Sequence, residues 1–296
     1  MYFKIRNQHL ALCIDSHGAE VVSLQNIHTG RQVIWNADPQ YWDEHSPILF
    51  PCVGGNWNGH ITIDNQSYAL PKHGLVKHMD FTLTSQTEDT LVFSVQADEQ
   101  TLQSFPYHFS LHAIYQLNDR SLQVSWVVKN HESELDMPFM IGGHPAFLLP
   151  DFDATDSIHG YLQIPQVDCL VSSPTLPHGF VMPQKAELFP LDHEHRLSLM
   201  NDTFRCDTIL DLRGMAQQAV LLDKTGRQLQ EIIMNEVPVL ALWSPQDGCC
   251  PFICVEPWWG CCDSYESSTP FNLRPFVNNV TPQGTWKQGY QINVLD

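Results

Sequence analysis

His144 lies in a short motif whose residue types suit acid–base chemistry. The motif is Gly142-Gly-His-Pro145, and it follows an apolar run directly. Glycines permit backbone geometries and close approaches that other residues forbid, and the following proline disfavours helix at the histidine. The motif therefore predicts an imidazole directed from the end of a strand. A core histidine in a tight turn is the alternative interpretation.

Glu256 is a second candidate for proton transfer. It follows the apolar run Phe252–Val255, which predicts a buried strand, and Pro257 is expected to end the pairing of that strand. A carboxylate between apolar neighbours loses solvation, so its pKa should rise toward the range of a general base. The alternative is a structural ion pair with Arg205 or Arg213.

Further candidate groups flank these two. His73 lies in a Pro-Lys-His-Gly sequence typical of a turn, and Lys77 follows four residues later. His73 belongs either to the same site as His144 and Glu256 or only to the turn. Trp258 and Trp259 follow Glu256 and offer flat faces that pack well against the C–H face of a sugar ring. Together these residues predict an acid–base site of histidine and glutamate without an evident metal or cofactor.

Two weaker patterns permit other interpretations. His193 and His195 have the spacing with which one strand face presents two imidazoles to a metal, as in a cupin-like enzyme, but their segment is dense with charge and resembles a solvated turn. Asp202 and Asp207 precede an apolar strand at residues 208–212, where either could hydrogen-bond a hydroxylated ligand or cap a turn.

The elements that must position these groups show period-two alternation almost throughout. Residues 107–117 and 122–128 alternate apolar and polar side chains around a turn at 118–121, which predicts a hairpin with one buried face. Similar patterns predict strands at residues 2–6, 10–14, 21–26, 31–35, 60–63, 67–70, 80–84, 91–95, 219–222, 229–234 and 239–244. Asp38-Pro39 predicts the start of one short helix, and residues 149–190 are the most loop-like. We expect one all-β domain over residues 1–296, a large antiparallel β-sandwich with long loops.

Composition excludes several classes of function. The chain has 296 residues and a formal charge of −18, which disfavours nucleic acid and membrane surfaces as partners. No apolar run approaches the length of a spanning helix, and the N-terminus does not resemble a signal peptide. The nine cysteines include the adjacent pairs Cys249-Cys250 and Cys261-Cys262, and we expect reduced thiols in a cytoplasmic protein.

Four stretches, in this order and spacing, resemble the aldose 1-epimerase (galactose mutarotase) superfamily, and the similarity is greatest to its shorter bacterial mutarotase-like branch. They are residues 49–54, Leu-Phe-Pro-Cys-Val-Gly; 70–75, Leu-Pro-Lys-His-Gly-Leu; 138–147, Pro-Phe-Met-Ile-Gly-Gly-His-Pro-Ala-Phe; and 256–263, Glu-Pro-Trp-Trp-Gly-Cys-Cys-Asp. The resemblance covers the chain from about residue 7 to the end.

The resemblance implies a β-sandwich with an open cleft for a pyranose. It makes His144 the acid that protonates the ring oxygen, Glu256 the base that deprotonates the C1 hydroxyl, and His73 a residue that holds the sugar. Asp207 falls where the family often places an acidic sugar contact. No metal or cofactor is implied. One departure is that Gly55 and Asn56 occupy the place of a common sugar-binding arginine. Lys77 keeps a cation in the second motif as a substrate-binding candidate, but a lysine does not reproduce the guanidinium fork. A sugar-binding or regulatory protein without turnover is therefore the alternative function.

Overall fold

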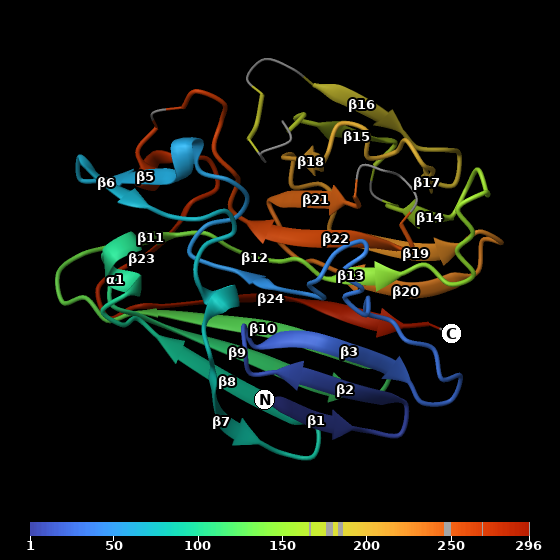
Figure 1. Cartoon of the computed structure of the whole chain (residues 1–296), viewed down its shortest axis with the longest axis horizontal. Coiled ribbons are helices and arrows are strands. Elements are labelled where there is room, and N and C mark those ends of the chain that lie inside the picture. Colours follow the sequence, from blue (N-terminus) through green and yellow to red (C-terminus); the bar gives the residue numbers. More distant parts are fainter. Residues whose placement is uncertain (166, 176–179, 183–185, 246–249, 268, 296) are drawn as a thin grey trace.

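The framework of the protein is a pair of large antiparallel sheets (Figure 1). The computed structural model describes residues 1–165, 167–175, 180–182, 186–245, 250–267 and 269–295. The first sheet has nine strands, in the order β17 (Arg196–Leu199), β14 (Gly160–Gln163), β19 (Gln218–Asp223), β20 (Gln228–Ile233), β24 (Thr285–Val294), β10 (Ser121–Asn130), β9 (Phe109–Asn118), β8 (Thr90–Gln96) and β7 (Thr82–Gln86).

The second large sheet has eight strands and contains both main candidate residues. Its order is β16 (Glu187–Pro190), β15 (Cys169–Ser172), β18 (Ile209–Asp211), β21 (Val239–Trp243), β22 (Phe252–Trp259), β12 (Ile141–Gly143) and β4 (Ile48–Leu49), and β13 (Ala146–Leu148) also pairs with β22. Figure 1 shows β21 and β22 above β10 and β24 of the first sheet.

Smaller elements complete the fold. A three-stranded sheet comprises β1 (Tyr2–Arg6), β2 (Leu10–Asp15) and β3 (Glu20–Asn26), and two pairs comprise β5 (His60–Ile63) with β6 (Gln66–Ala69) and β11 (Met137–Phe139) with β23 (Asn278–Val280). The described helices are short: α1 (Thr101–Ser104), η1 (Trp57–Gly59), η2 (Val76–His78) and η3 (Phe271–Leu273). No helix in the described ranges is long and apolar enough to cross a membrane.

The core lies between the two large sheets and is rich in aromatic side chains. Trp126 of β10 is fully buried and packs edge-on against Trp259 of β22, with 6.1 Å between ring centroids. Tyr290 of β24 lies 5.6 Å from the same Trp126 ring. The Trp126–Trp259 contact joins the two sheets directly, so one face of β22 belongs to the core.

The predicted all-β class and the long hairpin are confirmed. β9 and β10 pair in the expected register, with Leu117 opposite Leu122. The predicted strand at residues 31–35 forms only isolated bridges, from Gln32 and Ile34. The eight described cysteines are free thiols, as expected, and Cys249 lies outside the described residues.

Two local predictions are wrong. Asp38 begins a turn, in which its backbone oxygen accepts from Tyr41 and Trp42, rather than a helix. The chain beyond the turn is held in a non-helical path because Glu20 accepts from the backbone N–H groups of His45 and Ser46 at 2.7 and 2.8 Å.

Pro257 does not end a strand, because it lies inside β22 opposite Leu240 of β21. On the other edge of β22 the neighbour changes at this point: β13 pairs with residues 252–254 and β12 with Trp258 and Trp259. No ladder partner on that edge needs an N–H from residue 257, which is why a proline is tolerated there.

The Trp126 contact predicts a large effect on stability. Trp126→Ala removes a fully buried ring from between the sheets, so it should lower the free energy of unfolding by about 3–5 kcal/mol. Chemical denaturation followed by fluorescence measures the change. Leu135→Ala, at a site 53% exposed, is the control and should change it by less than about 0.5 kcal/mol. Equal effects would contradict the packing described.

Candidate active site

His144 lies at the break between β12 and β13, where the chain changes its position along β22. Its backbone N–H donates to Pro47 at 3.1 Å, and Pro145 accepts from the Val255 N–H at 3.2 Å. Gly142 permits the close packing needed here, since a Cβ atom there would lie 2.5 Å from Trp258 Cδ1. The interruption directs the imidazole away from the sheet ladder, as the sequence motif predicts.

Glu256 and His144 come together across this break. The Nε2 atom of His144 lies 3.2 Å from Oε2 of Glu256, and the two residues are 7% and 1% exposed. Within the described chain, neither Glu256 Oε2 nor the other ring nitrogen of His144, Nδ1, has a hydrogen-bond partner. The arginine alternatives are wrong, because Arg205 pairs with Glu187 and Arg213 pairs with Asp211.

Burial shifts the two groups in opposite directions because it disfavours the charged form of each. It lowers the pKa of His144 to about 3, and the charge of Lys72 adds to the effect. It raises the pKa of Glu256 well above the usual range, opposed by the Lys72 charge and by the Trp258 indole N–H. That N–H approaches the carboxylate without completing a hydrogen bond. Burial therefore favours the uncharged form of each group.

His73 joins the pair from the loop before η2. Its ring lies edge-on to that of His144, with 5.4 Å between centroids. Its Nδ1 accepts from the Gly54 backbone N–H at 3.1 Å. Burial, followed by the charges of His144 and the nearby lysines, lowers the pKa of His73 well below its usual value. The ring is therefore neutral with its hydrogen on Nε2, which makes Nε2 a donor.

A cavity of about 200 Å³ opens onto these three residues. Pockets for drug-sized ligands usually measure about 300–1,000 Å³, so this smaller cavity suits a ligand with one small ring. Aromatic side chains line the cavity: the Trp42 ring is tilted against the His144 ring at 4.9 Å between centroids, and Trp243 lies edge-on to His144 at 5.8 Å. The sequence analysis missed both tryptophans. Trp243 ends β21 opposite Cys254 of β22. The sequence predicted the strand that contains Trp243, but not that this strand pairs with the strand of Glu256.

Strand alternation separates the two tryptophans after Glu256. Trp258 shares the Glu256 face of β22 and lines the cavity. Trp259 points to the other face, against Trp126 and Trp286 in the core. The expectation that both rings contact a sugar is therefore wrong for Trp259, because successive side chains of a strand face opposite sides.

Two lysines line the cavity, although no arginine does within the described chain. Lys77 donates to both carboxylate oxygens of Glu44, at 2.7 and 3.0 Å, so its charge is already compensated. Lys72 lies beside the same cavity and lowers the pKa of His73, His144 and Glu256. The sequence predicted Lys77 and passed over Lys72.

Asp207 lies one layer behind the cavity wall. Its carboxylate accepts from Trp243 Nε1 and from the Thr175 hydroxyl, each at 3.1 Å. Thr175, Thr208 and Trp243 line the cavity, whereas Asp207 does not. The carboxylate thus orients Trp243 and Thr175, two residues that line the cavity.

The suggested metal residues are separated from this site. His193 is exposed and His195 half-exposed in the turn before β17, where His195 Nδ1 lies 2.9 Å from the Val167 carbonyl. In the described part of the chain, the three residues that could share a metal are His144, Cys254 and Glu256, with ligand atoms within 4.8 Å of one another. Cys254 shares the Glu256 face of β22, two residues earlier.

Comparison with known proteins agrees with this fold. A family model described as aldose 1-epimerase matches residues 1–275. The chain therefore belongs to the aldose 1-epimerase family. It is 28% identical over 301 residues to the protein LacX, chromosomal, of Lactococcus lactis subsp. lactis, and the match covers 100% of both chains.

Two solved structures are similar over almost their full length. A galactose mutarotase related enzyme from Lactobacillus acidophilus has a TM-score of 0.92 and 26% identity, covering 100% of this chain and 98% of that one. A galactose mutarotase-like protein from Lactobacillus casei has a TM-score of 0.91 and 24% identity, covering 100% of each. The fold is thus the galactose mutarotase-like β-sandwich.

The raised pKa of Glu256 predicts a pH-dependent stability cost. The folded protein keeps this carboxyl protonated to a higher pH than the unfolded chain, whose pKa is near 4.5. The stability that the protonated carboxyl contributes is fully present below pH 4.5, and it is lost as the pH rises through the higher pKa of the folded protein. Glu256→Gln should therefore raise Tm relative to the natural protein by roughly 2–4 °C near pH 8, and by progressively less toward pH 4.5.

Calorimetric or fluorescence melting over this pH range measures the difference. Glu134→Gln, at an exposed position, is the matched control and should show no such trend. A constant Tm difference between the Glu256 variant and the natural protein would show that burial does not hold the carboxyl protonated.

Proposed function

We propose that the protein is an aldose 1-epimerase that interconverts the α and β anomers of an aldohexose. The observation that carries the proposal is the 3.2 Å approach of His144 Nε2 to Glu256 Oε2 beside a cavity of single-ring size. Mutarotation must move one proton between two oxygens that are bonded to the same carbon. Two adjacent proton carriers match this demand.

The proposed reaction is a pair of coupled proton transfers. Glu256 takes the proton of the C1 hydroxyl while His144 protonates the ring oxygen, so the C1–O bond of the ring breaks and the aldehyde forms. Rotation about C1–C2 exposes the other aldehyde face, and the reverse transfers close the ring. The acid and base forms arise when one proton passes from the Glu256 carboxyl to His144, which leaves the total charge of the pair unchanged. Ring opening then returns both groups to their uncharged forms, the state that burial favours.

The remaining cavity residues receive binding roles. His73 donates from Nε2 to a sugar oxygen, and Trp258 packs against the C–H face of the ring. Lys77 donates to hydroxyls while paired with Glu44, and Asp207 acts through Trp243 and Thr175. No step requires a metal or cofactor.

Loss of either proton carrier should abolish most of the activity. We expect the natural protein to accelerate the change in optical rotation of freshly dissolved α-glucose or α-galactose. Each of Glu256→Gln and His144→Asn should lower kcat/KM by about 10²–10⁴-fold while circular dichroism stays unchanged. A natural protein that leaves the rotation of a panel of aldoses at the buffer rate would refute the proposal, and calorimetric sugar binding without catalysis would then favour a binding protein.

Removing the Lys72 charge should shift the pH dependence of the reaction. Lys72 lowers the pKa of both His144 and Glu256, so Lys72→Gln raises both values. The pH profile of kcat/KM should move to higher pH by less than about one unit. Lys4→Gln, on exposed β1, is the charge-matched control and should leave the profile in place. A shift to lower pH would contradict the assigned electrostatics.

A further inference from the structure

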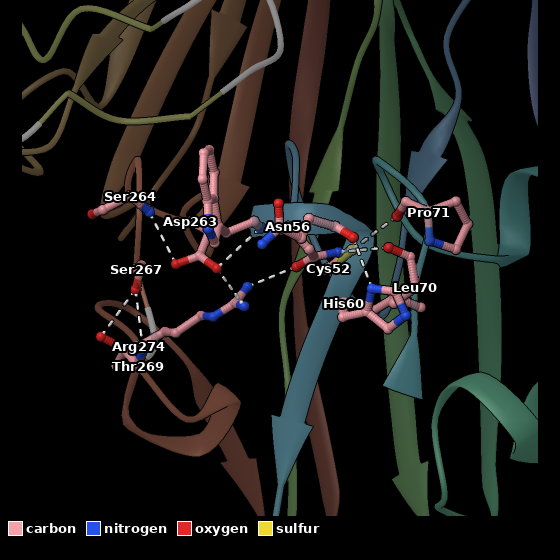
Figure 2. Close-up of polar contacts among 12 residues, drawn as sticks. Cys52, Asn56, His60, Leu70, Pro71, Asp263, Ser264, Ser267, Thr269 and Arg274 are labelled. Atoms are coloured by element: carbon pink, nitrogen blue, oxygen red, sulfur yellow. Dashed lines mark hydrogen bonds and ion pairs between the residues drawn. The ribbon is translucent and has the colours of Figure 1, made fainter. Parts of the chain in front are cut away.

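A buried polar cluster holds the loop at residues 52–57 (Figure 2), and its side chains do not line the cavity. Arg274 donates from Nη1 to Asn56 Oδ1 and from Nη2 to Asp263 Oδ2, both at 2.7 Å. Asp263 Oδ2 also accepts from the Trp57 backbone N–H at 3.2 Å. We call Arg274, Asp263 and Asn56 the Arg274 cluster.

The Arg274 cluster is costly to bury, since its three side chains are only 3–5% exposed. Removing a guanidinium and a carboxylate from water is repaid only when their geometry and hydrogen bonds are good. A buried ion pair is therefore weak support for a net gain in stability. Holding a particular local geometry is the alternative benefit, and the contacts of the cluster show which geometry it holds.

The Arg274 cluster connects three segments that surround His73. Asn56 Nδ2 donates to the Leu70 carbonyl at 3.0 Å, which joins the 52–57 loop to the loop that contains His73. The Asp263 N–H donates to the Gly55 carbonyl at 3.0 Å. Asn56 is thus held on its oxygen by Arg274 and on its nitrogen by the His73 loop.

Gly54 is the point where this loop contacts the imidazole. Its N–H donates to His73 Nδ1 at 3.1 Å, and its carbonyl accepts from the His73 N–H at 2.9 Å. Gly54 has φ of +64°, and a Cβ atom there would lie 2.3 Å from Cys262 Cβ. The loop is therefore packed closely against Cys262 at the residue that determines the His73 tautomer.

We propose that Arg274 is a positioning residue, which holds Asn56 and Asp263 so that the Gly54 N–H keeps His73 in its Nε2–H tautomer. The catalytic consequence rests on the proposed function, but the tautomer itself does not. The proposal also addresses the arginine that is missing at positions 55 and 56. A guanidinium reaches this loop from residue 274, where it supports the loop from behind instead of contacting a sugar.

Long-range ¹H–¹⁵N NMR of the histidine rings tests the proposal directly. The full-length natural protein should show His73, assigned by its loss in His73→Gln, as the Nε2–H tautomer alone. Arg274→Gln should yield a mixture of tautomers and a fall in kcat of about tenfold, larger than its change in KM. Arg213→Gln breaks an arginine–aspartate pair of similar length, with Asp211 at 2.6 Å, at a more exposed position away from the cavity lining, and should alter neither the His73 signals nor kcat.

Arg274→Lys covers the case in which the glutamine variant does not fold. Lysine keeps the charge but cannot reproduce the two-branched contact, so an intermediate tautomer mixture is expected. A folded Arg274 variant with only the Nε2–H tautomer and natural kcat would overturn the proposal, as would an Nδ1–H tautomer in the natural protein. If the natural protein lacks mutarotase activity, the tautomer measurement still decides the role of Arg274, so the two failures are distinguishable.

Discussion

Desolvation of the His144–Glu256 pair is the constraint on which the rest of the site depends. A buried carboxylate or imidazolium is costly, and burial therefore favours the uncharged forms of His144 and Glu256, which lie 3.2 Å apart. The aromatic rings of Trp42 and Trp243 exclude water from the pair. The same burial that costs stability favours the uncharged form of both groups, since it lowers the pKa of His144 and raises that of Glu256.

The architecture supplies this environment through one strand. β22 lies within the eight-stranded sheet and presents Trp259 to the core and Glu256 to the cavity. Its neighbour is broken between β12 and β13, and the break provides room for His144. A site assembled on strands is held more rigidly than one carried by loops alone. His144 lies in the two-residue break between β12 and β13. His73 comes from a loop, and that loop has the additional support of the Arg274 cluster.

A site residue could be predicted from the sequence where the residues beside it have strong structural preferences. Glu256 and His144 were predictable because each lies beside residues with strong backbone or burial preferences. Trp259 was misassigned because a pair of adjacent tryptophans does not reveal which one faces the core without the phase of the strand. The proline in β22 was misread because its tolerance depends on a gap in the neighbouring strand. Arg274 had no signal, since its partners Asn56 and Asp263 are distant or unremarkable in sequence.

The sequence by itself determined the all-β class, the principal hairpin and the identities of the two histidines and the glutamate. Period-two alternation and glycine or proline motifs are local properties, so a linear sequence displays them. Only the tertiary structure decided that His144, Glu256 and His73 share one cavity, that Trp258 rather than Trp259 faces it, and that Arg274 stands behind it. Those outcomes depend on strand order and on contacts between segments up to 218 residues apart, which no local pattern encodes.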